Sequence, residues 1–349
     1  MEYDVYYSTG GGSLIGGGAD VWVNDWIENI APHLDVKPIL AIHRTRPPEF
    51  ENDLGIEVVW QGDDVKGFGE LLKNARRINI LHGYYSPHRY LTDNKDKIHT
   101  VAIHCSVKNI MKASFVLDLE KSFHFYVEPK WENDIKSYAK YPFWIGNNDP
   151  KWNVHHDHLL TIPNFYEFKH NKDVVDNNKV GFAARMETRK CPHFLQGIDC
   201  EVFTEPTDIK WWERNLNLDT STWKTYTFKY ENIDNFYKRD WGISHSAHIY
   251  EPFGYSIFQA VDWGKIPILA HDWLPDYDYP FRAQSPEEFK EQYDNICNLT
   301  LKEKEDYLYP LREHLRQWDN KEEWRDRLLK LYNEWYLLIW QQQQNKTYH

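Results

Sequence analysis

The chain has 349 residues, and its 41 Lys and Arg residues against 53 Asp and Glu residues give a formal net charge of −12. This length is enough for two domains with separate cores, and the acidic charge argues against bulk attraction to nucleic acid or anionic membranes, although a local basic cleft is compatible with it. The sequence contains no run of 18 apolar residues, no N-terminal signal-peptide pattern and no CxxC spacing among its four cysteines. We therefore expect a cytoplasmic enzyme or binding protein with free thiols and no membrane span.

The first half of the sequence alternates short apolar strands with helical segments. Strands are predicted at residues 3–8, 36–42, 56–60, 78–82 and 100–104, and helical segments at 19–30, 71–77 and 107–113. This alternation indicates a parallel, doubly wound sheet. In the first helix, the spacing of Trp22, Val23, Trp26 and Ile27 predicts one buried face.

A glycine-rich loop at residues 10–18 separates the first strand from the first helix. It contains Gly11, Gly12, Gly16 and Gly17. Glycines let the backbone approach a ligand closely and present amides to an anion. The loop is therefore a candidate phosphate or sugar contact, with a flexible surface loop as the alternative.

Two later loops of the first half interleave basic and aromatic residues. The sequence HRTRPP carries His43, Arg44 and Arg46, and GYYSPHRY carries His88 and Arg89. Such groups suit phosphate contact and base stacking. Ordinary loop charge on an acidic protein is an equally weighted alternative. His104 ends the fifth strand and is either a structural histidine or a ligand contact.

A second unit of the same kind is predicted from residue 179 onward. Its strands are expected at 179–184, 200–203, 243–246 and 266–270, and the tail from residue 303 is helical. Residues 142–178, with a strand at 159–162, contain the end of the first domain and the crossover. We thus predict domains at 1–170 and 171–325, and a C-terminal helix at 326–349.

Arg185 and Lys190 follow the first strand of this second unit. Strand ends in such folds open onto the ligand crevice, where two cations would stabilise a departing diphosphate. A solvated surface pair is the alternative. The run HHDH at 155–158 lacks the ligand spacing of a zinc site, so we expect loop histidines and no metal.

Residues 242–273 form the most informative stretch of the chain. They predict a strand, a loop beginning EPFG at Glu251, a helix from Tyr255 and a buried strand. Because this helix starts just after Gly254, its first amides, including that of Ser256, can meet an anion. Glu251 then points into the ligand crevice, or it is simply an acid favoured by the helix dipole.

The segment E-P-F-G-x-x-x-x-Q-A-x-x-x-G-K-I-P-I resembles the donor-site motif of family 4 retaining glycosyltransferases. The resemblance implies an α/β protein of the GT-B fold, in which two Rossmann-like domains face a central cleft and the C-terminal helix returns to the N-terminal domain. It also implies that Glu251 contacts the donor sugar, with Gln259 at the place of the family's second Glu and near the ribose. Arg185 and Lys190 would neutralise the diphosphate, while His104 and the glycine-rich loop would contact the transferred sugar.

The implied reaction is retaining transfer of a sugar from a nucleotide-sugar, in particular a UDP-sugar, to a hydroxyl group, without a cofactor or metal. The short, aromatic-rich chain also resembles bacteriophage glycosyltransferases, including those that modify hydroxymethylated pyrimidines in DNA. That resemblance implies a DNA acceptor in the host cytoplasm, contacted by Arg44, Arg46, His88 and Arg89. Two alternatives stay open, namely a glycan or small-molecule acceptor, and a catalytically silent GT-B module that binds sugar nucleotides. The sequence determines neither the sugar nor the oligomeric state.

Overall fold

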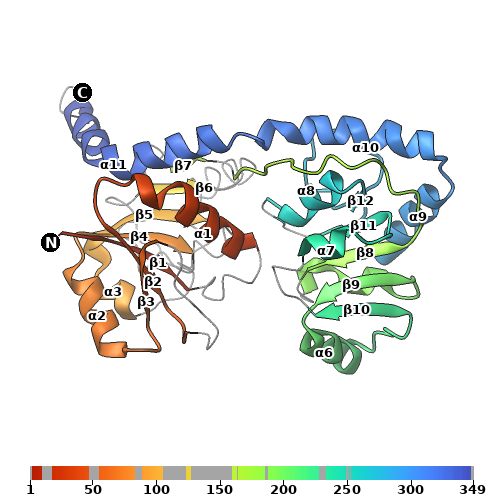
Figure 1. The fold of residues 1–349 in the computed structure, drawn as a ribbon, viewed down its shortest axis with the longest axis horizontal. Helices are drawn as coiled ribbons and strands as arrows, with labels where there is room; N and C mark the ends of the chain where they lie inside the picture. The colour runs from red at the N-terminus through yellow and green to blue at the C-terminus, as the bar shows by residue number, and fades with distance from the viewer. Residues whose placement is uncertain are drawn as a thin grey trace. The chain divides into compact units, whose positions relative to one another are not determined.

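The computed structural model describes residues 2–9, 18–46, 55–82, 89–104, 123–126, 159–162, 164–184, 188–227, 233–248, 251 and 253–346. The chain divides into two compact units (Figure 1). Unit 1 comprises Met1–Asn164 and Lys321–His349, and unit 2 comprises Phe165–Asn320. The sequence analysis placed the corresponding boundaries near residues 170 and 325. Among the described residues, none of the helices is both long and apolar enough to span a membrane.

Unit 1 is built on a parallel sheet with the strand order β3-β2-β1-β4-β5-β6-β7. The strands are β1 (Asp4–Ser8), β2 (Pro38–Ile42), β3 (Glu57–Trp60), β4 (Arg77–His82), β5 (Ile98–Ile103), β6 (Phe123–Tyr126) and β7 (Leu159–Thr161). In the register, Ser8 pairs with Ile42 of β2 and with His82 of β4. The residues that follow these strands therefore meet at one edge of the sheet.

Helices cover both faces of this sheet. They are α1 (Gly18–Asn29), α2 (Val65–Asn74), α3 (Arg89–Thr92) and α11 (Lys321–Lys346), with short 3-10 turns η1 (Ala31–His33) and η2 (Lys95–Lys97). Figure 1 shows α1 and α11 on one face and α2 and α3 on the other. The buried face predicted for the first helix is confirmed, because Trp22, Val23, Trp26 and Ile27 are at most 3% exposed.

The helix α2 differs from the segment predicted at residues 71–77. It begins at Val65 because the Asp64 side chain caps it, accepting a hydrogen bond from the amide of Gly67 at 2.8 Å. It ends at Asn74, and β4 begins at Arg77. The predicted helix therefore overran its true end.

The C-terminal helix α11 packs on unit 1 through aromatic side chains. The ring of Trp324 meets Trp22 edge-on at 6.1 Å between centroids, and that of Tyr332 meets Tyr6 edge-on at 5.3 Å. Trp324 and Tyr332 are 2% and 4% exposed. Residues from the two ends of the chain thus share one core.

Unit 2 contains a second parallel sheet, with the order β10-β9-β8-β11-β12. The strands are β8 (Val180–Ala183), β9 (Cys200–Thr204), β10 (Trp223–Thr227), β11 (Ile243–Ser246) and β12 (Ile266–Leu269). The edge strand β10 was not predicted from the sequence. Of its five residues only Trp223 is buried, so WKTYT lacks the apolar run that marks the other four strands.

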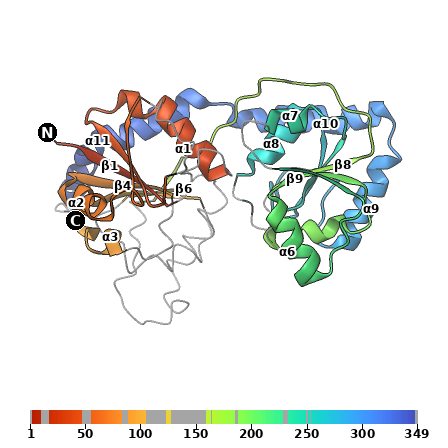
Figure 2. The same ribbon diagram turned by 60° about the horizontal axis from the view of Figure 1, so that its bottom comes forward.

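The helices of unit 2 lie on both faces of the sheet. They are α6 (Pro206–Leu216), α7 (Ile233–Tyr237), α8 (Tyr255–Asp262), α9 (Pro286–Cys297) and α10 (Leu301–Leu315), with 3-10 turns η6 (Thr188–Lys190), η7 (Pro192–Leu195) and η9 (Arg316–Trp318). Figure 2 shows α8 and α10 on one face and α6 and α9 on the other. The order of strands and helices is the doubly wound arrangement that the sequence predicted.

Asp262, at the end of α8, fixes the segment through which the chain enters unit 2. Its side chain is fully buried, and its carboxylate accepts hydrogen bonds from the consecutive amides of Lys169, His170 and Asn171 at 2.7 to 3.2 Å. The Tyr166 hydroxyl donates a further hydrogen bond to it at 3.2 Å. One carboxylate therefore accepts the hydrogen bonds of three consecutive amides in a segment without regular secondary structure.

The exit from unit 2 lies beside this entry segment. The amide of Tyr166 donates a hydrogen bond to the carbonyl of Trp318 at 2.9 Å, and Arg316 donates one to the Asn171 side chain at 2.6 Å. The two passages of the chain between the units are therefore hydrogen-bonded to one another.

Replacing Asp262 with alanine is expected to lower the free energy of unfolding by about 3 kcal/mol, because several buried donors lose a charged acceptor at once. Urea denaturation followed by circular dichroism measures this difference. The exposed Asp173→Asn variant, in the same segment, serves as the control and is expected to stay within about 0.5 kcal/mol of the parent. Equal stabilities for Asp262→Ala and the parent would contradict the role assigned to Asp262.

Candidate functional site

The candidate site lies at the carboxyl ends of β8 and β11 in unit 2. Lys190 ends the turn η6 that follows β8, and Glu251 follows β11. The Lys190 ammonium and the Glu251 carboxylate form an ion pair in which each side chain is 13% exposed. Two of the residues selected from the sequence are thus brought together in a nearly buried pair.

Backbone geometry around Lys190 explains how the turn is held. Cys191 adopts a left-handed conformation with φ 52°, which reverses the chain directly after Lys190. The carbonyl of Cys191 then faces β11, where Nε2 of His245 lies 2.9 Å from it. His245 is 1% exposed, so this contact ties the turn to the neighbouring strand.

His248 is the third member of the ion-pair cluster. It is 1% exposed, and its Nδ1 lies 3.5 Å from Oε2 of Glu251, at the outer limit of a hydrogen bond. Sequence reasoning missed this residue. Its position three residues before Glu251, just beyond a buried strand, could have marked it as a site residue.

Charge and burial act in opposite directions on the pKa of Glu251. Burial alone would raise the pKa of this carboxyl, but the charge of Lys190 and the contact with His248 outweigh it and hold the pKa well below its usual range. Burial, with the charge of Lys190, lowers the pKa of His248 to about 4. At neutral pH the cluster therefore holds an ammonium, a carboxylate and a neutral imidazole.

The first turn of α8 lies next to this cluster. Gly254 precedes the helix with φ 78° and offers no side chain to cap it. A Cβ at this position would lie 2.9 Å from Ile257 and 3.1 Å from Cγ of Glu251, so only glycine leaves room for the acid. The start of α8, with the amides of Tyr255 and Ser256, has the character of an anion site.

Gln259 lies one turn further along α8. Its side chain is 9% exposed, and its amide has no hydrogen-bond partner among the described residues. A buried amide in this state can both donate to and accept from a ligand.

In unit 1, His104 follows β5 and its Nε2 lies 2.8 Å from the carbonyl of Leu81. The ring meets Trp22 edge-on at 4.9 Å and His82 at 5.8 Å between centroids. Burial lowers the pKa of His104 to about 4, partly opposed by the carbonyl contact. With Nε2 donating to a carbonyl, Nδ1 of the neutral ring is the acceptor.

His43, selected from the sequence as a candidate acceptor contact, belongs to an aromatic group at the end of β2 whose other members the sequence did not indicate. The Tyr7 hydroxyl is 2.8 Å from Nδ1 of His43, and the His43 ring stacks on Phe68 at 6.0 Å and meets Tyr90 edge-on at 5.6 Å. Tyr7 is in β1 and His43 follows the neighbouring strand β2, whereas Phe68 and Tyr90 come from the helices α2 and α3.

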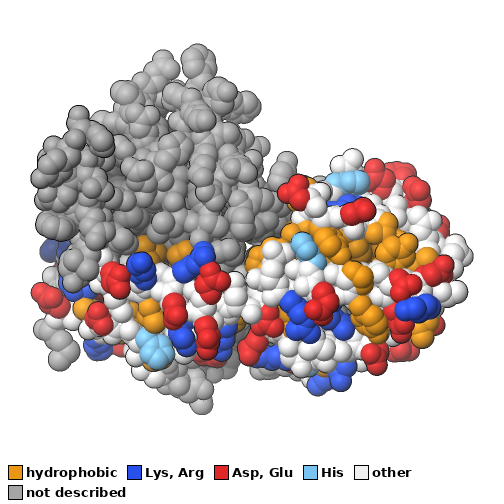
Figure 3. Space-filling model, turned by 90° about the horizontal axis from the view of Figure 1, so that it is seen from above, with side chains coloured by type: hydrophobic (Ala, Val, Ile, Leu, Met, Phe, Trp, Pro, Cys, Tyr) orange, Lys and Arg blue, Asp and Glu red, His pale blue; other side chains and the backbone are white. Residues whose placement is uncertain are grey.

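The arginines selected as acceptor contacts lie around this aromatic group and are largely exposed. Arg44 donates a hydrogen bond from Nε to the carbonyl of Thr9 at 2.9 Å. Arg46 lies 3.6 Å from Asp63, and Arg89 lies 3.2 Å from Asp93. Exposed pairs of this kind contribute little energy, so a phosphate can displace their carboxylates. On the described part of the face drawn in Figure 3, Lys and Arg are interspersed with Asp and Glu.

Several residues selected from the sequence lie outside the described residues. They are Gly11, Gly12, Gly16 and Gly17 of the glycine-rich loop, Arg185, His88 and the run at 155–158. Within the described ranges, no group of three or more His, Cys, Asp or Glu side chains could hold a metal ion.

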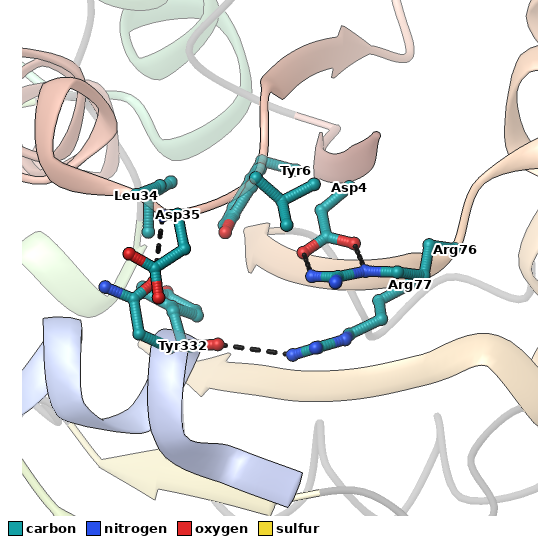
Figure 4. A pocket seen from close by; sticks show the side chains of 9 residues that line it. Asp4, Tyr6, Leu34, Asp35, Arg76, Arg77 and Tyr332 are labelled. Atoms are coloured by element: carbon teal, nitrogen blue, oxygen red, sulfur yellow. Dashed lines mark hydrogen bonds and ion pairs between the residues drawn. The ribbon is translucent and has the colours of Figure 1, made fainter. Parts of the chain in front are cut away.

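A small cavity of about 100 Å³ lies at the opposite edge of the unit 1 sheet, beside α11 (Figure 4). Asp4 forms a bidentate ion pair there with Arg76 at 2.7 and 2.8 Å, and Arg77 donates to the carbonyl of Tyr332 at 3.2 Å. These charges satisfy protein groups and join the amino ends of β1 and β4 to each other and to α11. We assign the cavity a structural role.

The fold that these two Rossmann-like units define is GT-B, as the sequence predicted. No protein-family model matches the sequence, and neither does any curated protein. The fold is therefore identified from similarity to solved structures.

Three solved structures illustrate this likeness. Sucrose-phosphate synthase from Thermosynechococcus elongatus matches with a TM-score of 0.61 at 12% identity, over 99% of both chains. An α-glucosyltransferase in complex with UDP-glucose and DNA containing an abasic site matches with a TM-score of 0.57 at 13% identity, over 95% of this chain and 99% of that one. A UDP-forming α,α-trehalose-phosphate synthase from Burkholderia vietnamiensis matches at 0.58 and 9% identity, over 94% and 99%.

The α-glucosyltransferase also matches as a complex with UDP and a 13-mer DNA containing a HMU base. That match has a TM-score of 0.52 at 13% identity and covers 98% of both chains. At such identities the comparisons establish the fold.

Replacing Glu251 with glutamine is expected to lower the free energy of unfolding at pH 7 by about 3 kcal/mol, because Lys190 is left as a buried unpaired charge. The pKa of Glu251 is depressed in the folded state, so its stabilising contribution is present above the unfolded value near 4.5 and is lost as the pH falls below it. The difference between parent and variant should therefore shrink between pH 5 and pH 3. Urea denaturation at several pH values measures it, and a difference that stays constant with pH would contradict the pairing.

Proposed function

We propose that the protein is a retaining glycosyltransferase that moves a sugar from a UDP-sugar to a hydroxyl acceptor. The observation that carries the proposal is the nearly buried Lys190–Glu251 pair beside the uncapped start of α8. It combines a cation and the amides at the start of a helix for a diphosphate with a carboxylate for sugar hydroxyls. The likeness to enzymes whose structures hold UDP or UDP-glucose supports this choice of donor.

Each group of the cluster has a distinct part in holding the donor. Lys190 and the amides at the start of α8 bind the diphosphate, whose charge matches both. Glu251 accepts hydrogen bonds from sugar hydroxyls, and Gln259 bonds the ribose through its amide. Arg185 is proposed as a second cation for the diphosphate, following the resemblance in its motif.

The transfer breaks the bond between the anomeric carbon and the diphosphate oxygen and forms one to the acceptor oxygen on the same face of the sugar. The acceptor proton passes to the departing diphosphate, which serves as the base. Lys190 stabilises the negative charge that develops on this leaving group. His104 and the glycine-rich loop are assigned to the transferred sugar, and we propose no metal or cofactor.

For the acceptor we propose a hydroxymethylated pyrimidine in DNA, as in a phage enzyme acting in the host cytoplasm. Arg44, Arg46 and Arg89 supply exposed phosphate contacts around the aromatic group of His43 and Tyr90, which suits an unstacked base. The α-glucosyltransferase complexes with DNA support this choice. The net charge of −12 favours the second candidate, a glycan or small-molecule acceptor.

A panel of UDP-, GDP- and ADP-sugars with duplex DNA carrying hydroxymethylcytosine or hydroxymethyluracil tests the proposal. We expect a gain in DNA mass and release of UDP with a UDP-sugar, and neither with unmodified DNA. Release of UDP with unchanged DNA would move the acceptor to a glycan or metabolite. Binding of UDP without any release would indicate the silent module, and the absence of both would overturn the proposed function.

The variant Lys190→Met is expected to lower kcat about 100- to 1,000-fold, because a preorganised charge at the leaving group is lost. Arg214→Met, on the exposed side of α6, is the matched control and should leave kcat unchanged. Stopped-flow or mass-spectrometric assay of UDP release measures both. An equal kcat for Lys190→Met and the parent would show that Lys190 does not stabilise the transition state.

The variant Gln259→Glu tests the contact with the ribose. A carboxylate accepts stronger hydrogen bonds than an amide, so the KM for the UDP-sugar should fall about fivefold while kcat stays unchanged, since the ribose is remote from the reacting bond. With a donor that lacks both ribose hydroxyls, variant and parent should have the same KM. A difference that persists with that donor would place Gln259 away from the ribose.

A further inference from the structure

We propose that His248 is a positioning residue for Glu251, holding its carboxylate through a hydrogen bond donated from Nδ1 when Lys190 turns to the diphosphate of a bound donor. This inference rests on the proposed function of the Lys190–Glu251 pair. It adds a residue that the donor-site motif does not contain.

The position of His248 is the first argument. Nδ1 faces the carboxylate at 3.5 Å, and the ring is packed edge-on against Phe182 and His245 at 5.9 and 5.7 Å between centroids. This packing fixes the direction in which Nδ1 points. The side chain is 1% exposed, so it is not free to turn toward solvent.

The unsatisfied ring nitrogens of His248 are the second argument. Nε2 is buried and has no hydrogen-bond partner among the described residues, and Nδ1 has only the long contact to Glu251. Burying polar atoms in this state costs free energy that a purely structural side chain would avoid. The ligand-free site therefore contains an imidazole whose hydrogen bonds are incomplete.

The charges that surround His248 determine its protonation. The charges of Lys190, Glu251 and Arg189 act on its pKa, and its ring meets that of His245 edge-on at 5.7 Å between centroids. Burial and the Lys190 charge keep the ring neutral, so it carries one proton. Facing an ionised carboxylate, this proton belongs on Nδ1, which leaves the buried Nε2 as an acceptor.

Donor binding changes the balance of these interactions. A diphosphate carries more negative charge than one carboxylate and competes with Glu251 for Lys190. When Lys190 moves toward the diphosphate, the Glu251 carboxylate loses part of the attraction that offsets its burial. A hydrogen bond from His248 can replace that attraction. The Lys190 charge also repels the Nδ1–H dipole of the neutral ring, so the 3.5 Å contact can shorten when that charge moves away.

The test compares His248→Leu with His248→Asn, whose side-chain amide can place an N–H near the position of Nδ1. We expect His248→Leu to lower kcat about 10- to 100-fold, the loss of one hydrogen bond to a charged group, with His248→Asn within about fivefold of the parent. Affinity for UDP alone, which lacks the sugar, should change less than twofold in both. His193→Leu, the same substitution in the turn η7 without contact to Glu251, should keep the parent kcat.

The pH profile separates positioning from a general structural effect. In His248→Leu the acid limb of kcat should move to higher pH, because Glu251 has lost a stabilising partner, whereas His193→Leu should leave it in place. Equal losses in the Leu and Asn variants, or an unmoved acid limb, would overturn the proposal.

A measurement on the parent protein keeps the inference testable without turnover. Ring-nitrogen NMR should show His248 neutral, with its proton on Nδ1, and the proton signal should move downfield when UDP binds. A proton on Nε2 instead would overturn the inference even if sugar transfer is observed. If UDP binds but no sugar donor is turned over, the proposed function fails. The position of the ring proton in this spectrum then still shows whether Nδ1 of His248 donates a hydrogen bond to Glu251.

Discussion

The arrangement of unit 2 depends on the burial of two opposite charges, Lys190 and Glu251, at the carboxyl end of one sheet. A single charge in this position would be strongly destabilising, and a pair is tolerated only with close geometry and further hydrogen bonds. The surrounding backbone provides that geometry: Cys191 turns the chain behind the lysine, and Gly254 leaves room for the acid. A pair held in this way is stable in the free protein, and under the proposed function its two charges are divided between the diphosphate and the sugar of a bound donor.

The helix α8 joins this site to the rest of the chain. At its first residue it presents amides beside Glu251, and at its last residue Asp262 holds the segment by which the chain enters unit 2. Arg312 of α10 adds hydrogen bonds to the carbonyls of Val261 and Lys172. The eight residues of α8, about two helical turns, therefore connect the candidate site directly to the entry segment.

The sequence predicted much of this arrangement for identifiable reasons. Continuous apolar runs marked the buried strands of both sheets, and the glycine at 254 with the apolar helix behind it marked the start of α8. The edge strand β10 was missed because Trp223 is the only buried residue of its five, and α2 was misplaced because Asp64 was not recognised as its cap. Apolar patterns in the sequence show where a helix or strand begins and ends when its side chains are fully buried. They fail where only some of its side chains are buried.

Within the site, the sequence indicated Lys190, Glu251 and Gln259 because each lies in a motif with fixed spacing. It named His43 as a candidate acceptor contact, but it gave no indication that this ring meets Tyr7, Phe68 and Tyr90, which come from β1, α2 and α3. Such groups depend on the order of strands in the sheet, which spacing along the chain does not encode. His248 is an intermediate case, since it is close to Glu251 in the sequence but its ring direction is fixed by Phe182 and His245.

The shared core of α11 and unit 1 also bears on the order in which the protein folds during synthesis. Unit 2 is one continuous segment, whereas unit 1 is completed only by residues made after it. Until Trp324 and Tyr332 emerge from the ribosome, the aromatic surface formed by Tyr6, Trp22 and Trp26 has no cover from α11. The nascent chain therefore carries an exposed apolar surface for as long as unit 2 takes to be translated, which makes unit 1 the half that benefits from a chaperone.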